Sequence, residues 1–431
     1  MFQTGCAEQQ LDVPLFAELY GYGQFLGRRN RGIHDPLFCR VFSFNDNGER
    51  AMIVYTDICS TDDVYAREMR GKLACRFGIL PERIAFAATH THSAPPLSST
   101  DGGGSGVRNM EFQETWNRAV ISVAAAAIRD EEPIECAEAG AAVLPCKLGK
   151  NRIDPAKNVT DESIRWVRFL RADGSCKVLL HSHGIHGTAM NMEYDRLVSA
   201  DWPGAVNRII KERKLADMPL FLLGPCGDQL PYTSCKCTHN DKAADMIGEQ
   251  YADILRKSIE QGGEKITDLT IRAVLKTVKL PVVKQTAEEL LADADNFRKD
   301  DCMRHHTFLE EMAMLVRQGK DLTPAHDFQV MKIGEISLFF IPGEYFVEDG
   351  KRLMERSRSK FCIAASVSNG NGAYYPSEEN MKKYPDVESR HNSHGFGFYE
   401  VYCYPYRQHF KYQDHVAEFV AEQLLNLEAS L

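Results

Sequence analysis

Strand-length apolar runs alternate with helical stretches along most of this 431-residue chain. Residues 38–44 and 51–58 have the length and apolar character of strands, and residues 62–77 have helical spacing. A further strand at 83–88 precedes a helix at 111–129. This alternation is typical of a layered α/β fold, so we expect mixed β-sheets flanked by helices in an α/β/β/α arrangement.

The rest of the chain continues this pattern, and no Pro/Ser-rich linker or internal repeat divides it. We therefore expect one large domain over residues 1–431, with a loop-rich first block up to residue 37. Further strands are expected at 134–143, 166–170, 178–180, 220–223, 271–282 (a pair), 328–340 (a hairpin turning at Gly334-Glu335) and 361–367. Further helices are expected at 204–214, 241–261, 287–317 and from Val416 onward.

The composition excludes several classes of function. The net charge of −9 argues against nucleic acid or an anionic membrane as the main partner. No apolar stretch approaches the roughly 18 residues that would cross a bilayer. The thirteen cysteines are odd in number and scattered, and the N-terminus lacks the features of a signal peptide. We therefore expect a cytoplasmic protein that acts on a small molecule, without membrane insertion.

Two histidines follow the strand expected at 83–88. His90 and His92 stand before two prolines and a glycine-rich run, which cannot continue regular structure. On an extended backbone the i, i+2 spacing would put both rings on one face, where one ion could contact both. A pair of ordinary loop histidines has the same pattern, so the interpretation depends on residues further along.

Other expected strands also end in polar, glycine-bearing loops. These loops carry His186, Asp228, Glu344 and Tyr374. Ligand sites in α/β proteins collect at strand ends, because loops converge there without disturbing the core. Two or three nitrogen ligands with a carboxylate, and a position left for water, describe a catalytic zinc site.

Some of these residues have structural alternatives. His181, His183 and His186 cannot all bind one ion, and we expect at least one of them to be structural. Glu344 would alternatively cap a helix that begins near Tyr345. The interpretation of each residue therefore depends on where the fold places it.

Two further patterns are weak indications of metal binding. The run from Cys235 to His239 contains two cysteines and a histidine but lacks a second C-x-x-C pair. His305 and His306 lie in a helical, charge-rich stretch, which is typical of a solvated face. The sequence is also compatible with a second ion near Asp57 or Asp35.

The chain resembles the neutral/alkaline (non-lysosomal) ceramidase-like family, specifically its N-terminal catalytic domain. No single block is decisive, but their shared order makes the resemblance specific. The blocks are Gly32-Ile33-His34-Asp35-Pro36-Leu37, Ala88-Thr89-His90-Thr91-His92-Ser93, Asn151-Arg152, His186-Gly187-Thr188-Ala189-Met190, Leu197-Val198-Ser199-Ala200-Asp201, Gly227-Asp228-x-x-Pro231, Pro342-Gly343-Glu344 and Tyr374-Tyr375-Pro376-Ser377-Glu378-Glu379.

The resemblance implies a zinc-dependent hydrolase site. Carried over onto this sequence, the zinc ligands are His90, His186, Glu344 and Tyr374. The residues that would orient substrate and stabilise the oxyanion are His92, Arg152 and Tyr399.

The chain also departs from the family. The family's G-D-x-S-P block contains a serine that is important for ceramide hydrolysis, and Leu230 stands at that position here. The match ends with the catalytic domain, so we expect the family's C-terminal immunoglobulin-like module to be absent. The zinc site and the hydrolytic chemistry are therefore carried over, but the lipid substrate is not.

The leading hypothesis is a zinc hydrolase that cleaves an amide, ester or lactone bond of a soluble substrate. Zinc-bound hydroxide would attack the carbonyl, which zinc and Tyr374 would polarise. Arg152 or Tyr399 would hold the developing negative charge, and His92 would move the proton.

Three other hypotheses remain. The first is a true ceramidase, in which Leu230 merely lines an acyl groove. The second is a degenerate protein that keeps the fold but only binds a metal or ligand. The third is a metal-dependent amidohydrolase barrel, which the two strands expected before the His90 motif weaken.

Overall fold

The computed structural model describes residues 1–22, 28–97, 107–190, 196–232, 242–299, 305–384, 399–403 and 410–431. Its first sheet has five strands in the order β5-β4-β3-β1-β6. The strands are β1 (Phe2–Leu11), β3 (Leu37–Asp46), β4 (Glu49–Thr56), β5 (Ile84–Ala88) and β6 (Glu132–Pro133). Strand β5 runs parallel to β4, whereas the other pairs are antiparallel.

A second five-stranded sheet has the order β12-β10-β9-β7-β14. Its strands are β7 (Cys136–Val143), β9 (Ser163–Leu170), β10 (Cys176–His183), β12 (Met218–Leu223) and β14 (Glu264–Ile266). Strand β12 runs parallel to β10, so the carboxyl ends of these two strands open into neighbouring loops.

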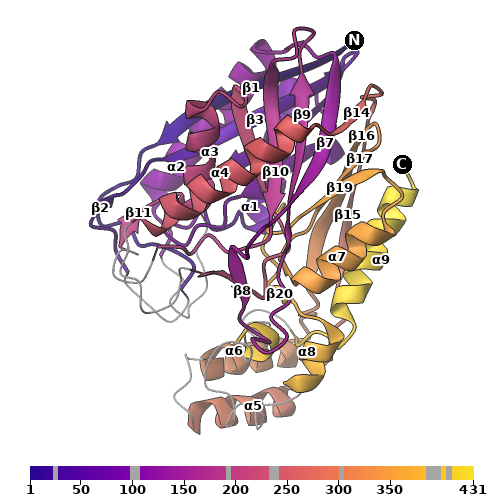
Figure 1. The fold of residues 1–431 in the computed structure, drawn as a ribbon. Helices are drawn as coiled ribbons and strands as arrows, with labels where there is room; N and C mark the ends of the chain where they lie inside the picture. The colour runs from indigo at the N-terminus through magenta and orange to yellow at the C-terminus, as the bar shows by residue number, and fades with distance from the viewer. Residues whose placement is uncertain are drawn as a thin grey trace.

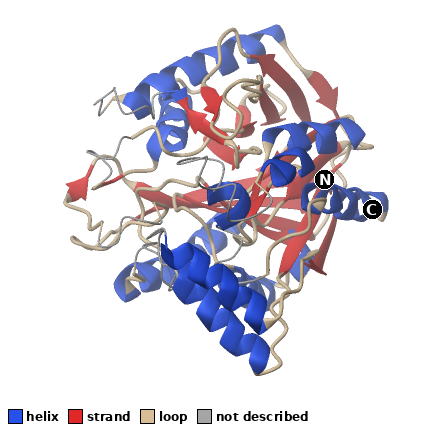
Figure 2. Ribbon diagram, turned by 90° about the horizontal axis from the view of Figure 1, so that it is seen from below, coloured by secondary structure: helices blue, strands red, loops and turns tan. Residues whose placement is uncertain are grey.

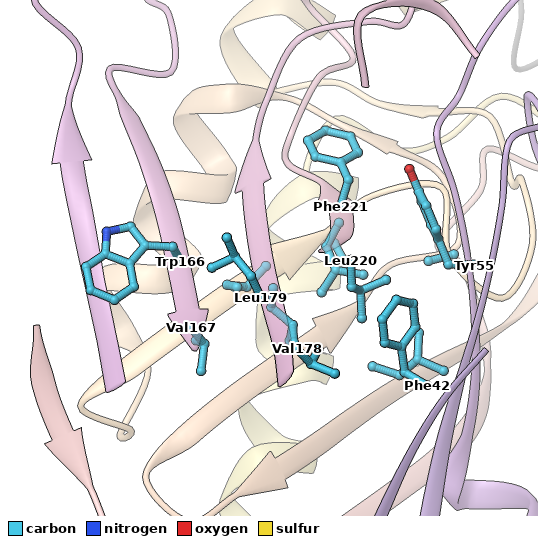
Figure 3. Close-up of a cluster of buried hydrophobic side chains, with 14 of the residues drawn as sticks. Phe42, Tyr55, Trp166, Val167, Val178, Leu179, Leu220 and Phe221 are labelled. Atoms are coloured by element: carbon cyan, nitrogen blue, oxygen red, sulfur yellow. The ribbon is translucent and has the colours of Figure 1, made fainter. Parts of the chain in front are cut away.

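The two sheets pack face to face through a shared apolar core. Phe42 and Tyr55 of the first sheet belong to one buried cluster with Val178 and Leu220 of the second (Figure 3). All four side chains are fully buried. Burying a side chain of this size contributes about 1.5–3 kcal/mol, so this core holds the loops at the strand ends in fixed relative positions.

Helices cover the outer face of each sheet (Figure 1). Helices α1 (Asp63–Phe77) and α2 (Met110–Arg129) pack on the first sheet, where Trp116 lies in a second buried cluster. Helices α3 (Asp201–Glu212) and α4 (Ala243–Gln261) pack on the second sheet. The expected α/β/β/α arrangement is therefore confirmed.

A third sheet has the order β15-β16-β17-β19. Its strands are β15 (Ile271–Lys279), β16 (Ala325–Ile333), β17 (Ile336–Phe340) and β19 (Phe361–Ala365). Helices α7 (Val347–Arg356) and α9 (Val416–Ala429) contact this sheet. Strands β17 and β19 are parallel, which provides another pair of adjacent carboxyl ends.

Helices α5 (Ala287–Lys299) and α6 (His305–Arg317) lie side by side at the end of the molecule far from the N-terminus (Figures 1 and 2). Three short strand pairs lie among the loops: β2 (Gly32–Ile33) with β11 (Leu197–Val198), β8 (Gly149–Asn151) with β13 (Gln229–Pro231), and β18 (Glu344–Tyr345) with β20 (Tyr374–Tyr375). The remaining elements are η1 (Pro81–Arg83), α8 (Glu378–Lys383) and the π-helical turn η4 (Tyr399–Cys403).

Three expectations about secondary structure are wrong. The first block is loop-rich only after residue 11, because β1 pairs along its whole length with β3. The helix expected at 287–317 is two helices, α5 and α6, and residues 300–304 between them lie outside the described part. The strand pair expected at 271–282 is the single strand β15, which pairs with β16.

The described helices include none that is long and apolar enough to cross a bilayer. The described strands form open sheets, so the barrel alternative is excluded for this part of the chain.

Candidate metal centre

Four buried side chains bring their ligand atoms together at the strand ends. The ligand atoms of His90, His186, Cys226 and Glu344 all lie within 4.8 Å of one another. These residues follow the carboxyl ends of β5, β10, β12 and β17 respectively. The convergence of separate loops that the sequence indicates is thus present in the fold.

His90 is held with its Nε2 atom toward the cluster. Its Nδ1 atom lies 2.8 Å from the carbonyl oxygen of Cys59, and a carbonyl only accepts, so Nδ1 carries the proton. The Nε2 atom lies 3.5 Å from Oε1 of Glu344. The backbone here is left-handed, with a φ of 60° at His90, so the extended conformation expected for this motif is wrong.

His186 is oriented in the same way. Its Nδ1 atom donates to the carbonyl oxygen of Gln229 at 2.8 Å, and its own carbonyl oxygen accepts from the indole of Trp202 at 2.8 Å. Burial, together with the charge of Arg152, lowers the pKa of His186 to about 4. Neutral imidazole with one ring nitrogen bonded to a carbonyl is the form in which histidine binds metals.

Glu344 faces both imidazoles. Its Oε2 atom lies 2.9 Å from Nε2 of His186 and has no hydrogen-bond partner among the described residues. Since neutral His186 has no hydrogen on Nε2, two acceptor atoms face each other at this distance. A divalent cation would satisfy both, so the donor set fits a metal ion such as zinc.

The charges of this cluster favour a protonated His90 beside an ionised Glu344. Burial opposes a charge on His90, but Cys59 and Glu344 raise its pKa well above the ordinary value. Burial likewise opposes the Glu344 carboxylate, yet the two histidines hold its pKa well below the usual range. A metal ion would therefore displace a proton that His90 and Glu344 share.

A close backbone contact places His186 beside His90. Thr91 forms an isolated parallel bridge with Gly187, and the amide of His92 donates to the Gly187 carbonyl at 3.3 Å. A Cβ at residue 187 would lie 2.8 Å from the His90 carbonyl oxygen. Only glycine therefore lets the two loops cross at this distance.

Glu344 and Tyr374 are neighbours on two short parallel strands. Residue 344 pairs with residue 374 between β18 and β20. The Tyr374 hydroxyl is buried and lies 3.2 Å from a terminal nitrogen of Arg152. The N-cap residue of α7 is Phe346, and the first amide of the helix, that of Val347, donates to Asp228, so the alternative that Glu344 caps this helix is wrong.

Asp228 has a structural role. Its Oδ1 atom accepts from the amide of Val347 at 3.0 Å, and its Oδ2 atom accepts from Asn151 at 2.7 Å. Its backbone carbonyl accepts from the amide of Arg152 at 2.9 Å. Asp228 therefore joins the start of α7 to the loop that carries Arg152, and both of its carboxylate oxygens are already bonded.

Arg152 lies against the cluster and is paired with Glu400. Its guanidinium donates to the Gly227 carbonyl at 2.8 Å and lies 3.3 Å from Nε2 of His186. On its other side it forms an ion pair of 3.0 Å with Glu400. Despite burial, Glu400 and Tyr374 raise the pKa of Arg152, so the guanidinium stays charged.

His92 lies beside both cluster histidines. Its ring centroid is 4.9 Å from that of His90 and 5.7 Å from that of His186. Its Nδ1 atom is buried and without a hydrogen-bond partner in the described part of the chain. Burial, with His90 and His186 close by, holds the pKa of His92 well below its usual range, so the ring is a neutral proton acceptor.

Tyr399 begins the turn η4, directly before Glu400. Its side chain is half-buried. The pKa of Tyr374 is raised mainly by burial and by Glu344, and Tyr399 makes a smaller contribution in the same direction. Tyr399 therefore lies in the neighbourhood of Tyr374 and Arg152.

The other sequence candidates lie outside the cluster. His181 bonds with Tyr251 and Asn207, and His183 bonds with the Ser163 carbonyl, so both are structural.

The aspartates considered for a second ion are engaged elsewhere. Asp57 pairs with Arg40 at 2.9 Å, and Asp35 accepts from the amide of Ala200 at 2.8 Å. Neither belongs to a metal-type group within the described ranges. The run from Cys235 to His239 lies outside the described residues, as does the side chain of His305.

Sequence reasoning missed two members of this site, Cys226 and Glu400. Cys226 stands two residues before Asp228 in the same glycine-bearing loop at a strand end. The rule that ligand residues collect at strand ends indicates Asp228, and it indicates the Cys226 thiol equally. Glu400 follows Tyr399 in a stretch without periodicity, and nothing in its surroundings indicated that it pairs with Arg152.

No family model matches this sequence, and no curated protein matches it either. Two solved structures are similar to it. One is a crystal structure of neutral ceramidase from Pseudomonas aeruginosa, with a TM-score of 0.76 and 15% identity over 100% of this chain and 74% of that chain. The other is a ceramidase complexed with C2, with the same TM-score and identity over 100% of this chain and 75% of that chain. This chain therefore has a neutral ceramidase-like fold.

Proposed function

We propose that this protein is a zinc-dependent hydrolase that cleaves an amide, ester or lactone bond of a soluble small molecule. The observation that carries the proposal is the cluster of His90, His186 and Glu344, in which Oε2 of Glu344 lies 2.9 Å from Nε2 of neutral His186 with no hydrogen between them, and Oε1 lies 3.5 Å from Nε2 of His90. The likeness in fold to two ceramidases, which are amide hydrolases by name, supports the reaction class.

In this proposal the metal ligands are His90, His186, Glu344 and Tyr374. Zinc bound there would act as a Lewis acid and would lower the pKa of a bound water to about 7. The carbonyls of Cys59 and Gln229 keep both imidazoles in the ligand tautomer by accepting from their Nδ1 atoms.

The groups beside the ligands would act on the substrate. Arg152, charged and held by Glu400, would stabilise negative charge on the substrate oxygen. Tyr399 would assist in this role as a second donor. His92, neutral and with Nδ1 unpartnered in the described part, would accept and return the proton.

A ceramide is the second candidate substrate, and the likeness to the two ceramidases favours it. Leu230 argues against ceramide as the substrate, because in the family that the sequence resembles a serine stands at this position. Turnover of a fluorescent ceramide in detergent, compared with turnover of short-chain N-acyl compounds, separates the two candidates.

We also propose that the protein works in the cytoplasm. The nine cysteines whose side chains the structure describes are all free thiols, and most of them are buried. Reduced thiols in such number are typical of cytosolic proteins.

The test is a screen of N-acyl, ester and lactone substrates with protein stripped of metal and then reloaded with zinc. We expect activity only after reloading, and none in His186→Ala. His306→Ala, which removes a histidine of α6, is the matched control and should behave as the unaltered protein. Full activity of stripped protein, or of His186→Ala, would contradict the proposal.

A further inference from the structure

We propose that Cys226 is a further ligand of the same metal ion, so that the centre contains a thiolate besides its imidazoles and carboxylate. This inference rests on the metal site proposed above and concerns its donor set. The Sγ atom of Cys226 lies within 4.8 Å of the ligand atoms of His90, His186 and Glu344. The side chain is fully buried, so the thiol faces the cluster and not solvent.

The backbone fixes the thiol beside Glu344. The amide of Gly227 donates to the Tyr345 carbonyl at 2.9 Å, which docks this loop against β18. A Cβ at residue 227 would lie 2.6 Å from the Glu344 carbonyl oxygen, so only glycine permits this approach. Residue 226 is thereby held next to the carboxylate ligand.

The same loop also orients His186. The amide of Gln229 donates to the Cys226 carbonyl at 2.8 Å, which closes a tight turn. The carbonyl of Gln229 in turn accepts from Nδ1 of His186 at 2.8 Å. One short turn therefore presents the thiol and sets the direction of an imidazole ligand, as expected for residues that share an ion.

The Cys226 thiol has no competing hydrogen bond within the described ranges. Other buried thiols of this protein do: Cys176 donates to the Val178 carbonyl at 3.3 Å, and Cys362 donates to the Met354 carbonyl at 3.4 Å. A buried thiol aimed at lone pairs of nitrogen and oxygen, rather than at a carbonyl, is the arrangement that a cation would satisfy.

Cys59 provides the contrast within the site. Its Sγ atom lies 3.5 Å from Nδ1 of His90, the ring nitrogen that is already bonded to the Cys59 carbonyl. Glu344 lies at the other ring nitrogen, Nε2. Cys59 forms a second metal-type group with His90 and His92, whose ligand atoms also lie within 4.8 Å of one another, but this group does not include Glu344 or His186. The geometry therefore assigns ligation of the ion shared with Glu344 and His186 to Cys226.

The chemistry of ligation is simple. When the metal–sulfur bond forms, the thiol releases its proton to water, and no oxidation state changes. A thiolate and a carboxylate together balance the charge of a divalent ion. Soft sulfur favours zinc over magnesium, calcium or manganese, so Cys226 would make the centre selective for zinc-like ions.

The test is titration of the metal-free protein with Co²⁺, followed by absorption spectroscopy. A thiolate ligand adds a sulfur-to-cobalt charge-transfer band in the near ultraviolet to the visible bands of the bound ion. We expect this band at one equivalent of Co²⁺, its loss in Cys226→Ser, and its persistence in the matched control Cys59→Ser.

The outcomes separate this inference from the function on which it rests. Binding of Co²⁺ without the band, or a band that survives in Cys226→Ser, overturns ligation by Cys226 but leaves the metal site standing. Failure of the unaltered protein to bind Co²⁺ overturns both the ligation by Cys226 and the proposed metal site. X-ray absorption at the zinc edge of the unaltered protein needs no variant: a sulfur shell at about 2.3 Å supports the inference, and only nitrogen and oxygen neighbours overturn it.

Discussion

The Oε2 atom of Glu344 lies 2.9 Å from the Nε2 atom of His186, although neither atom carries a hydrogen when His186 is neutral. Two acceptors at this distance repel each other unless a proton or a cation lies with them. The guanidinium of Arg152 lies beside the pair, 3.3 Å from Nε2 and 3.9 Å from Oε2, but not between the two atoms. The contact joins β18 to the loop after β10, two elements from different sheets. We therefore interpret this contact as the main evidence for a metal ion in the fold.

The pair of Arg152 and Glu400 should control catalysis without controlling metal binding. Glu400→Gln removes the charge that holds the guanidinium in place, and Arg152→Lys removes its forked contact with Gly227. We expect kcat to fall by about 10²–10³ in Arg152→Lys, the usual effect of losing an oxyanion donor, and by less in Glu400→Gln.

Steady-state kinetics and zinc analysis check this prediction together. Arg208→Lys, which changes an exposed arginine of α3, is the matched control and should have no effect. Loss of zinc in either variant would contradict the assignment of Arg152 and Glu400 to the substrate, because the arginine would then act on the metal ligands.

Gly187→Ala should weaken metal binding while leaving the fold intact. The added Cβ would lie 2.8 Å from the His90 carbonyl, so the loops that carry His90 and His186 must separate. Because metal ligands tolerate little displacement, we expect a fall of at least about tenfold in zinc affinity. Calorimetric titration with zinc measures it.

Gly71→Ala is the control for Gly187→Ala. Gly71 lies within α1, and a Cβ there meets nothing within 4 Å. Alanine at such a helical site should raise stability by roughly 0.5–1 kcal/mol and leave zinc affinity unchanged. Equal zinc affinity in the two variants would show that the crossing at Gly187 does not position the ligands.

Asp349 should make stability depend on pH. Its side chain is buried in α7, and burial, aided by Asp228 and opposed by Arg352, raises its pKa to about 7. The unfolded chain has a carboxyl pKa near 4, so the native state binds the extra proton between these values. Stability contributed by the protonated form is therefore lost as the pH rises from about 4 to about 7.

Asp349→Asn removes this effect. At pH 8 we expect the variant to be more stable than the unaltered protein, by up to about 4 kcal/mol, and at pH 4 the two should be similar. Denaturant unfolding at both pH values measures the difference. Glu355→Gln, at an exposed position of the same helix, is the control. A variant that is less stable at pH 8 would contradict the raised pKa.

Much of the fold and of the candidate site could be predicted because buried parallel strands have a clear sequence pattern. The runs that became β5 and β17 are nearly continuous in apolar residues, β10 has an apolar centre at residues 178–180, and each run stops at polar residues. The rule that ligand sites collect at strand ends selects His90, His186 and Glu344 as one group, although their strands belong to three different sheets. The structure brings these three together.

The remaining features depend on contacts that a local pattern does not contain. Strand β1 is polar and short of β-branched residues, and pairing with β3 determines its conformation. Asp228 looked like a ligand because it follows a strand, but the amide of Val347, distant in sequence, uses its carboxylate. Glu400 acquires a role only because the fold brings Arg152 to it.

The most direct test of the account is the zinc content and zinc affinity of the unaltered protein beside His186→Ala. We predict about one tightly bound zinc per chain, and a loss of affinity in the variant beyond the roughly 10–100-fold that second-shell changes cause. Unaltered protein that holds no zinc after growth in zinc-supplied medium, or a variant that binds zinc as tightly, would contradict the shared ion at His90, His186 and Glu344.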